Sequence, residues 1–240
     1  MRVQPDAVLT GPPVNSIDEL PDRLAAIDQA LPPTDGLACF NRMYRLVTAS
    51  VKQHVGAGFF ADPGWIAQLD IVFGNVYLDA VRASVQQPDQ VSRAWAALLD
   101  RRADTRVTPL QFALAGMNAH INRDLPVAVV TTYDTLSTSP DAGSQHADFQ
   151  RVNTVLAQVE PTIRQSFLDA LLQSADRAIP GLQDVVANFD MVKARETAWA
   201  NATTMWALRQ LSSASEVDFR DGLDHLVGFA GRGLLVPVLF

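Results

Sequence analysis

Four polar residues interrupt an otherwise apolar stretch at residues 109–126. Asn118, His120, Asn122 and Asp124 all fall within seven positions of one another. A neutral histidine can transfer a proton near pH 7, and a neighbouring carboxylate can orient its ring. Asparagine amides can hold a carbonyl or enolate oxygen. We therefore predict that His120 and Asp124 are catalytic and that the two asparagines contact the substrate.

Other apolar segments carry similar insertions, each on a helical face shared with aromatic or aliphatic residues. The main pairs on such faces are Asp70 with Tyr77, His146 with Asn153, and Arg195 with Trp199. Burying polar groups is costly unless they find partners. A polar cavity shared by several helices of a bundle would explain all of these insertions together. We favour that hypothesis over a structural network, in which Arg195 would form a buried ion pair with Asp70 or Asp79.

The resulting candidate site has two groups of residues and no metal ligands. The predicted catalytic residues are His120, His146, Asp124 and Asp70. The predicted substrate-binding residues are Asn118, Asn122, Asn153, Lys193, Arg195, Trp199, Phe112 and Tyr77. In this site a cationic side chain would bind an anionic group such as a carboxylate, and the aromatic residues would shape an apolar pocket.

These residues favour an enzyme that acts on a small, largely apolar molecule by acid–base or shape-driven chemistry. Such an enzyme would be an isomerase, lyase or cyclase, including one for a biosynthetic polyketide or polyene, and it would need no cofactor. One alternative is a metal-dependent hydrolase that uses His120, Asp124 and His146. Another is a non-catalytic protein that binds an apolar ligand.

Structural roles are the competing interpretation for the polar residues of the 109–126 stretch. Asp124 precedes Leu125 and Pro126, so it could cap the start of the next helix. Asn118 and Asn122 could join neighbouring helices instead of contacting a ligand.

The elements that would position these residues are all helical. Apolar residues recur at helical spacing, N-cap and proline signals mark helix starts, and no convincing alternating strand pattern is present. A Pro-rich N-terminal arm at 1–34 precedes a single all-helical domain at 35–240, a bundle of about eight to ten helices with an internal cavity. The predicted helices cover residues 17–31, 36–55, 63–86, 91–101, 109–123, 126–136, 145–159, 161–177, 181 or 185 to 211, and 217–229. Residues 126–136 are rich in β-branched side chains, so a strand is the alternative there.

The amino-acid composition argues against some classes of binding partner. The chain has 240 residues, of which 48% are hydrophobic, and a net charge of −7. This acidic balance argues against a general binder of nucleic acids or anionic membranes, which needs a basic face. The single cysteine, Cys39, and the absence of a signal-like N-terminus favour a cytoplasmic protein. The predicted partner is a small apolar molecule, with no nucleic acid and no membrane, and the oligomeric state stays open.

Five motifs together resemble an actinobacterial family described as a domain of unknown function. They occur in order as FNRMY at 40–44, LDIVFGNVYLDA at 69–80, PLQFALAGMNAHINRDLP at 109–126, HADFQRVN at 146–153 and NFDMVKARETAW at 188–199. The resemblance extends over most of the chain from about Asp35 onward. It implies one helical domain of this size and carries no activity with it.

Overall fold

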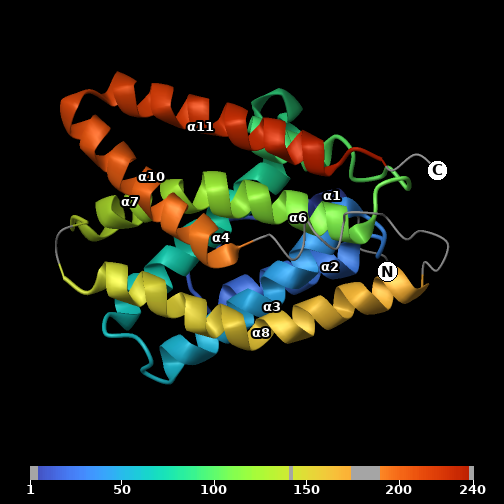
Figure 1. Ribbon diagram of the computed structural model, residues 1–240, viewed down its shortest axis with the longest axis horizontal. Coiled ribbons are helices and arrows are strands. Elements are labelled where there is room, and N and C mark those ends of the chain that lie inside the picture. Colours follow the sequence, from blue (N-terminus) through green and yellow to red (C-terminus); the bar gives the residue numbers. More distant parts are fainter. Residues whose placement is uncertain (1–4, 141–142, 174–189, 238–240) are drawn as a thin grey trace.

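All the regular secondary structure in the described part of the chain is helical, as predicted (Figure 1). The computed structural model describes residues 5–140, 143–173 and 190–237, and no strand occurs among them. The α-helices are α1 (Pro5–Leu9), α2 (Glu19–Ala30), α3 (Gly36–Gly56), α4 (Pro63–Gln86), α5 (Arg93–Leu99), α6 (Pro109–Ala119), α7 (Leu125–Leu136), α8 (Gln145–Gln173), α10 (Met191–Leu211) and α11 (Ser213–Leu234).

Several helix starts follow directly from local sequence signals. The side chain of Asp35 accepts a hydrogen bond from the Leu37 amide at the start of α3, and Asp62 caps α4 in the same way. Thr108 and Gln111 form a capping box at the start of α6. These caps satisfy amides that have no partner within the helix, so the predicted starts of these three helices are confirmed.

Two predicted breaks between helices do not occur, because proline is accommodated inside a longer helical stretch. α8 continues past Pro161. Pro161 and Ala157, four residues earlier, are both exposed, so the carbonyl that loses its partner can bind water instead. The predicted start of the following helix at 181 or 185 lies outside the described residues.

The second interruption was expected near Arg123, yet the chain stays helical from α6 into α7. A π-helical turn, His120–Asp124, joins the two helices. The Leu125 amide donates to the His120 carbonyl, five residues earlier. The wider turn accommodates Pro126 without breaking the rod.

The helices pack around two hydrophobic clusters. The first includes Phe40, Tyr77 and Trp95 and joins α2, α3, α4, α5 and α6. The second includes Trp65 and Phe149 and joins α4, α7, α8 and α10. In Figure 1, α11 runs along one side of the molecule, α8 along the other, and α6 lies between them.

The N-terminal segment contributes α2, which packs along α3. Leu20, Leu24 and Ile27 of α2 are fully buried in the first cluster. This segment therefore forms part of the same packed core as the rest of the domain.

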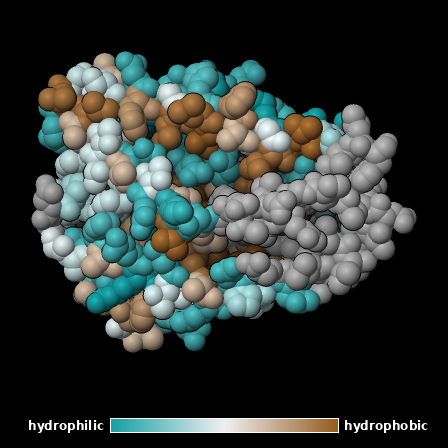
Figure 2. All heavy atoms as spheres, in the orientation of Figure 1, coloured by the Kyte–Doolittle hydropathy of each residue, from teal (hydrophilic) through white to brown (hydrophobic). Residues whose placement is uncertain are grey.

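The outer face of α11 carries exposed apolar side chains. Leu226 and Phe229 are the clearest examples, and Figure 2 shows apolar residues among polar ones along this helix. Nothing in the described part of the chain covers this face. No helix of that part is long and apolar enough to cross a membrane.

Candidate functional site

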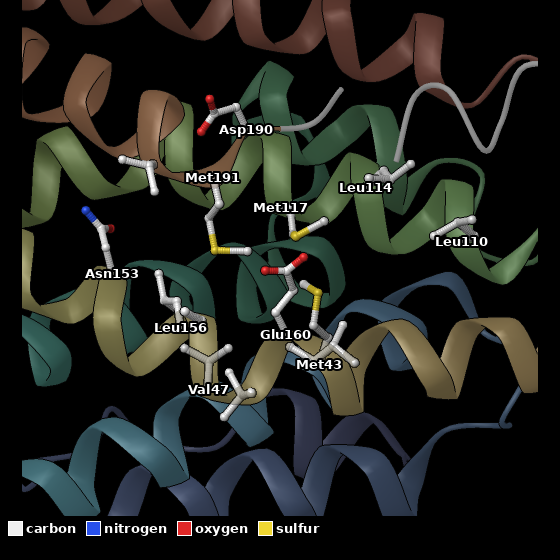
Figure 3. A pocket seen from close by; sticks show the side chains of 14 residues that line it. Met43, Val47, Leu110, Leu114, Met117, Asn153, Leu156, Glu160, Asp190 and Met191 are labelled. Atoms are coloured by element: carbon white, nitrogen blue, oxygen red, sulfur yellow. The ribbon is translucent and has the colours of Figure 1, made fainter. Parts of the chain in front are cut away.

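A pocket of about 260 Å³ lies between α3, α6, α8 and the start of α10 (Figure 3). A water molecule occupies about 30 Å³ in the liquid, so this space suits a small molecule. Aliphatic and methionine side chains dominate its walls, with Asn153, Glu160 and Asp190 as the polar lining residues. The main apolar residues are Met43, Val47, Leu110, Leu114, Met117, Leu156, Ile163 and Met191.

A second pocket, of about 50 Å³, adjoins the first. The two pockets share Val47 and Leu156 in their walls. The smaller pocket is also lined by Tyr44, Asp70 and Arg195. Most of the other lining residues of the smaller pocket are apolar, so the two pockets together form a mainly apolar site in which Asp70 and Arg195 are the acidic and basic residues of the smaller part.

Asp70 belongs to α4, a helix that is apolar nearly all round and crosses the interior. Its carboxylate oxygen Oδ2 is buried and has no hydrogen-bond partner among the described residues. Only 8% of the residue is exposed. Burial raises the pKa of Asp70 from 3.8 to about 7, because the charged form loses its hydration. This side chain can therefore exist in both protonation states near neutral pH.

Arg195 reaches the small pocket from α10 and binds only neutral acceptors. Its Nε donates to Asn153 Oδ1 at 2.8 Å, and its Nη2 donates to the Phe149 carbonyl at 2.8 Å. The guanidinium also lies over the Phe149 ring, 4.2 Å from the centroid. Burial lowers the pKa of Arg195 to about 9.

The predicted ion pair between Arg195 and Asp70 or Asp79 is not formed. Asp79 is exposed and pairs with Arg82, and Asp70 and Arg195 line the same pocket without an ion pair between them in the described structure. The predicted ion pair is therefore wrong. Arg195 instead joins α10 to α8 through its hydrogen bonds, and its buried charge lacks a carboxylate partner within the described residues.

His120 and Asp124 interact with each other within the π turn, with 3.3 Å between His120 Nδ1 and Asp124 Oδ2. Asp124 is fully buried and also accepts hydrogen bonds from Trp95 Nε1 at 2.7 Å and Arg123 Nη1 at 2.9 Å. It makes no capping bond to the backbone of α7, so its interpretation as an N-cap is wrong.

The ring of His120 stacks on Phe73, with 3.6 Å between the centroids. Phe73 lines the small pocket, so His120 lies directly behind one of its walls. His120 Nε2 is buried without a hydrogen-bond partner among the described residues. Burial lowers the pKa of His120, an effect that Asp124 opposes, and the neutral ring is the stable form near pH 7.

His146 lies elsewhere, exposed on α8 and stacked on Trp199 with 4.5 Å between the ring centroids. The structure does not bring it to His120 and Asp124. No group of three His, Cys, Asp or Glu side chains that could hold a metal ion occurs in the described residues. The metal-dependent hydrolase therefore gains no support from the geometry.

Asn118 joins α6 to α11, whereas the hydrogen bond of Asn122 stays within the α6–π turn rod. Asn118 Nδ2 donates to the Val227 carbonyl of α11 at 2.9 Å, and Asn122 Nδ2 donates to Asn118 Oδ1 at 3.1 Å. Neither residue lines the two pockets. The polar face of α6 thus contacts α11, as the structural alternative proposed.

Three further predicted binding residues also lie away from the pockets. Tyr77 Oη donates to Asn41 Oδ1 in the first cluster, and Phe112 is buried in that cluster. The side chain of Lys193 is 80% exposed and pairs with Asp190. Of all the predicted residues, only Asp70, Asn153 and Arg195 line the two pockets.

The apolar walls of the larger pocket were not among the predicted site residues. Leu110, Leu114 and Met117 form a regular stripe on one face of α6, which is also the pattern of ordinary core packing. The stripe lines the pocket because α8 and α10 leave space opposite it. The one sequence signal for this pocket is its methionine residues, including Met43 and Met191, because flexible methionine side chains can adapt to a ligand.

A family model described as a family of unknown function (DUF5995) matches residues 17–237, so the chain belongs to that family. No curated protein and no solved structure matches the chain.

Proposed function

We propose that this member of the family is an enzyme that acts on a small, largely apolar molecule, with Asp70 as its acid–base group. The observation that carries the proposal is the buried, unpartnered Oδ2 of Asp70 in the wall of a pocket. A buried polar atom without a partner is unusual in a folded protein and calls for an explanation. A substrate that exchanges a proton with Asp70 supplies one.

The pKa of Asp70 suits this role. A general acid or base works best when its pKa lies near the working pH, and burial raises the pKa of Asp70 to about 7. Arg195 and Asn153 lie on the same site and can stabilise an oxygen that gains negative charge. This combination favours proton transfer next to a carbonyl, as in an isomerase or lyase. A cyclase is the less specific version of the proposal, in which the pocket accelerates the reaction mainly by holding the substrate in a reactive conformation.

His120 has a supporting role in this scheme. Its ring holds Phe73 against the small pocket, and Asp124 fixes the ring orientation. His120 therefore positions a wall of the pocket, while Asp70 contacts the substrate.

The first test asks whether the larger pocket binds an apolar molecule. We expect equilibrium dialysis to show that N-phenyl-1-naphthylamine binds the wild type, and that Met117→Trp abolishes binding because the indole fills the pocket. Leu226→Trp, on the exposed face of α11, is the matched control and should bind like the wild type. Equal binding by all three proteins would overturn the assignment of the pocket.

The second test measures whether the protein catalyses proton transfer. In deuterated water, we expect the wild type to accelerate exchange of the α protons of 2-octanone or the isomerisation of oct-3-en-2-one, followed by NMR. Asp70→Asn should abolish the acceleration, since an amide cannot accept the proton. Acceleration that survives Asp70→Asn would remove Asp70 from the catalytic role.

Non-catalytic binding is the second candidate function, and the apolar lining of the larger pocket favours it. Dialysis would then detect binding that Met117→Trp abolishes, while no α-proton exchange would accompany it.

A further inference from the structure

We propose that the substrate is an uncharged ketone with a medium-length apolar chain, and that the Tyr44 hydroxyl binds its carbonyl oxygen while Asp70 takes the proton next to it. This inference rests on the proposed function and adds the substrate class and a second catalytic residue of the same site. It depends on two buried polar atoms without partners, on their common position at the small pocket, and on the apolar pocket beside it.

The hydroxyl of Tyr44 is the second unpartnered polar atom of the small pocket. Tyr44 lines this pocket together with Asp70, and its Oη is buried without a hydrogen-bond partner among the described residues. Only 4% of the residue is exposed. A buried polar atom without a partner calls for an explanation. A ligand oxygen that accepts a hydrogen bond from Tyr44 supplies one.

Ring contacts place Tyr44 over the face of α4 that carries Asp70. The centroid of the Tyr44 ring lies 6.0 Å from that of Phe73 and 5.7 Å from that of Tyr77. Asp70, Phe73 and Tyr77 are spaced three and four residues apart, so they share one helical face. Tyr44 and Asp70 do not hydrogen-bond to each other. Both groups are therefore available to one ligand.

Tyr44 is suited to donate a hydrogen bond. Burial, and next the charge of Asp70, raise the pKa of Tyr44 well above 10, so the hydroxyl keeps its proton. The ring of His120 packs on the Tyr44 ring with 4.4 Å between the centroids and helps to fix its orientation. A fixed donor in a site that excludes water stabilises an oxygen that gains negative charge.

The two groups act on adjacent atoms of a ketone. Ionised Asp70 accepts a proton from the carbon next to the carbonyl. The electron pair of the broken C–H bond forms the C=C bond of an enolate, and the carbonyl π electrons move to the oxygen that Tyr44 holds. Asp70 then returns the proton to the same carbon, or to the γ carbon of an unsaturated ketone, which shifts the double bond. The cycle consumes no co-reactant.

The charges at the small pocket favour a neutral head group. Ionised Asp70 repels an anion, and charged Arg195, which lines the same pocket, repels a cation. The pocket measures about 50 Å³, so it suits the carbonyl group and the carbons next to it. The rest of the chain extends past Val47 and Leu156, which line both pockets, into the larger apolar pocket.

The first experiment observes 2-octanone, labelled with carbon-13 at its carbonyl, bound to the protein by NMR. We expect the bound resonance to lie downfield of its position in hexane, because a hydrogen bond draws electron density from the carbonyl carbon. Tyr44→Phe should move the resonance back toward the hexane position. In competition with N-phenyl-1-naphthylamine, the same variant should bind the ketone about fivefold more weakly.

Tyr133→Phe is the matched control. Tyr133 is also fully buried, but it belongs to the second cluster and lines neither pocket. This variant should match the wild type in resonance position and affinity. Thermal unfolding checks that both variants are folded, and Tyr44→Phe should remain close to the wild type because it removes a hydroxyl without a protein partner.

Kinetics then test the catalytic part. We expect Tyr44→Phe to lower the kcat for α-proton exchange of 2-octanone about a hundredfold, as for loss of one oxyanion donor. Tyr133→Phe should leave the rate unchanged.

The outcomes separate this inference from the proposed function. A bound resonance that is the same in the wild type and Tyr44→Phe, or exchange that Tyr44→Phe leaves undiminished, overturns the role of Tyr44 alone. Failure of 2-octanone to displace bound naphthylamine overturns the ketone as the substrate class. A resonance that depends on Tyr44, without any exchange, supports the ketone site and overturns catalysis. Binding of neither molecule overturns the proposed function as well.

Discussion

Single side chains inside this bundle differ in how completely their hydrogen bonds are satisfied. Asp124 accepts from Trp95, Arg123 and His120 and has no further need of a ligand. Asp70 Oδ2 has no partner in the described residues, although it is buried in a similar way. Completed networks hold a fold together, and incomplete ones mark places where a ligand or water belongs. This difference separates Asp124 from Asp70 as a candidate for contact with the substrate.

We expect Asp124→Ala to destabilise the protein by about 3–5 kcal/mol, because it leaves Trp95 Nε1 and Arg123 without their buried acceptor. Urea denaturation measures the change. Asp79→Ala removes an exposed carboxylate that pairs with Arg82 and should cost less than about 1 kcal/mol. Similar losses in the two variants would contradict a structural role for Asp124.

Among the elements, the rod formed by α6, the π turn and α7 carries four of the candidate polar residues, Asn118, His120, Asn122 and Asp124. The π turn brings His120 and Asp124 to the buried side of the rod, next to Trp95 and Phe73. The same rod presents Asn118 to α11 and Met117 to the larger pocket. One continuous helix therefore serves both the packing of α11 and the wall of the site.

α11 is held against α5 by a close approach at Gly228. A Cβ atom there would lie 2.7 Å from the backbone of Arg93, and backbone cannot move aside as a flexible side chain can. We expect Gly228→Ala to destabilise the protein by about 1–3 kcal/mol, measured by urea denaturation. Gly222→Ala on the same helix meets nothing within 4 Å and should stabilise by about 0.5–1 kcal/mol through helix propensity. A stabilising Gly228→Ala would show that the two helices can separate without loss.

Across the whole molecule, the site lies where the two hydrophobic clusters meet. Val47, Phe73 and Met191 pack against both clusters. Phe73 and Met191 each line one of the two pockets, and Val47 lines both. Boundaries between packed cores are harder to fill completely than their centres. The pockets follow from this incomplete filling.

The site should also affect global stability through Asp70. Its pKa is 3.8 in the unfolded chain and about 7 in the folded protein. The folded state therefore keeps a proton that the unfolded state loses between these values, and stability falls as the pH rises from about 4 to 7. Asp70→Asn removes this cost. We expect it to be more stable than the wild type by up to roughly 4 kcal/mol at pH 8, with the difference vanishing near pH 4.

Urea denaturation of both proteins across this pH range measures the difference, in which contributions from the other carboxylates cancel. A constant difference between pH 4 and pH 8 would mean that Asp70 is not held in a desolvated environment.

The amino-acid sequence by itself determined the helical class, the capped starts of α3, α4 and α6, and the burial of Asp70 and Arg195 on apolar faces. These features depend on neighbours within a few residues, so local spacing is enough to predict them. Only the tertiary structure decided which polar residues reach a pocket. Asn118 faces the Val227 carbonyl, while Asn153 faces Arg195, because helices distant in sequence pack against them. Helix periodicity defines the faces of a helix, but the partner of each face is set by long-range packing.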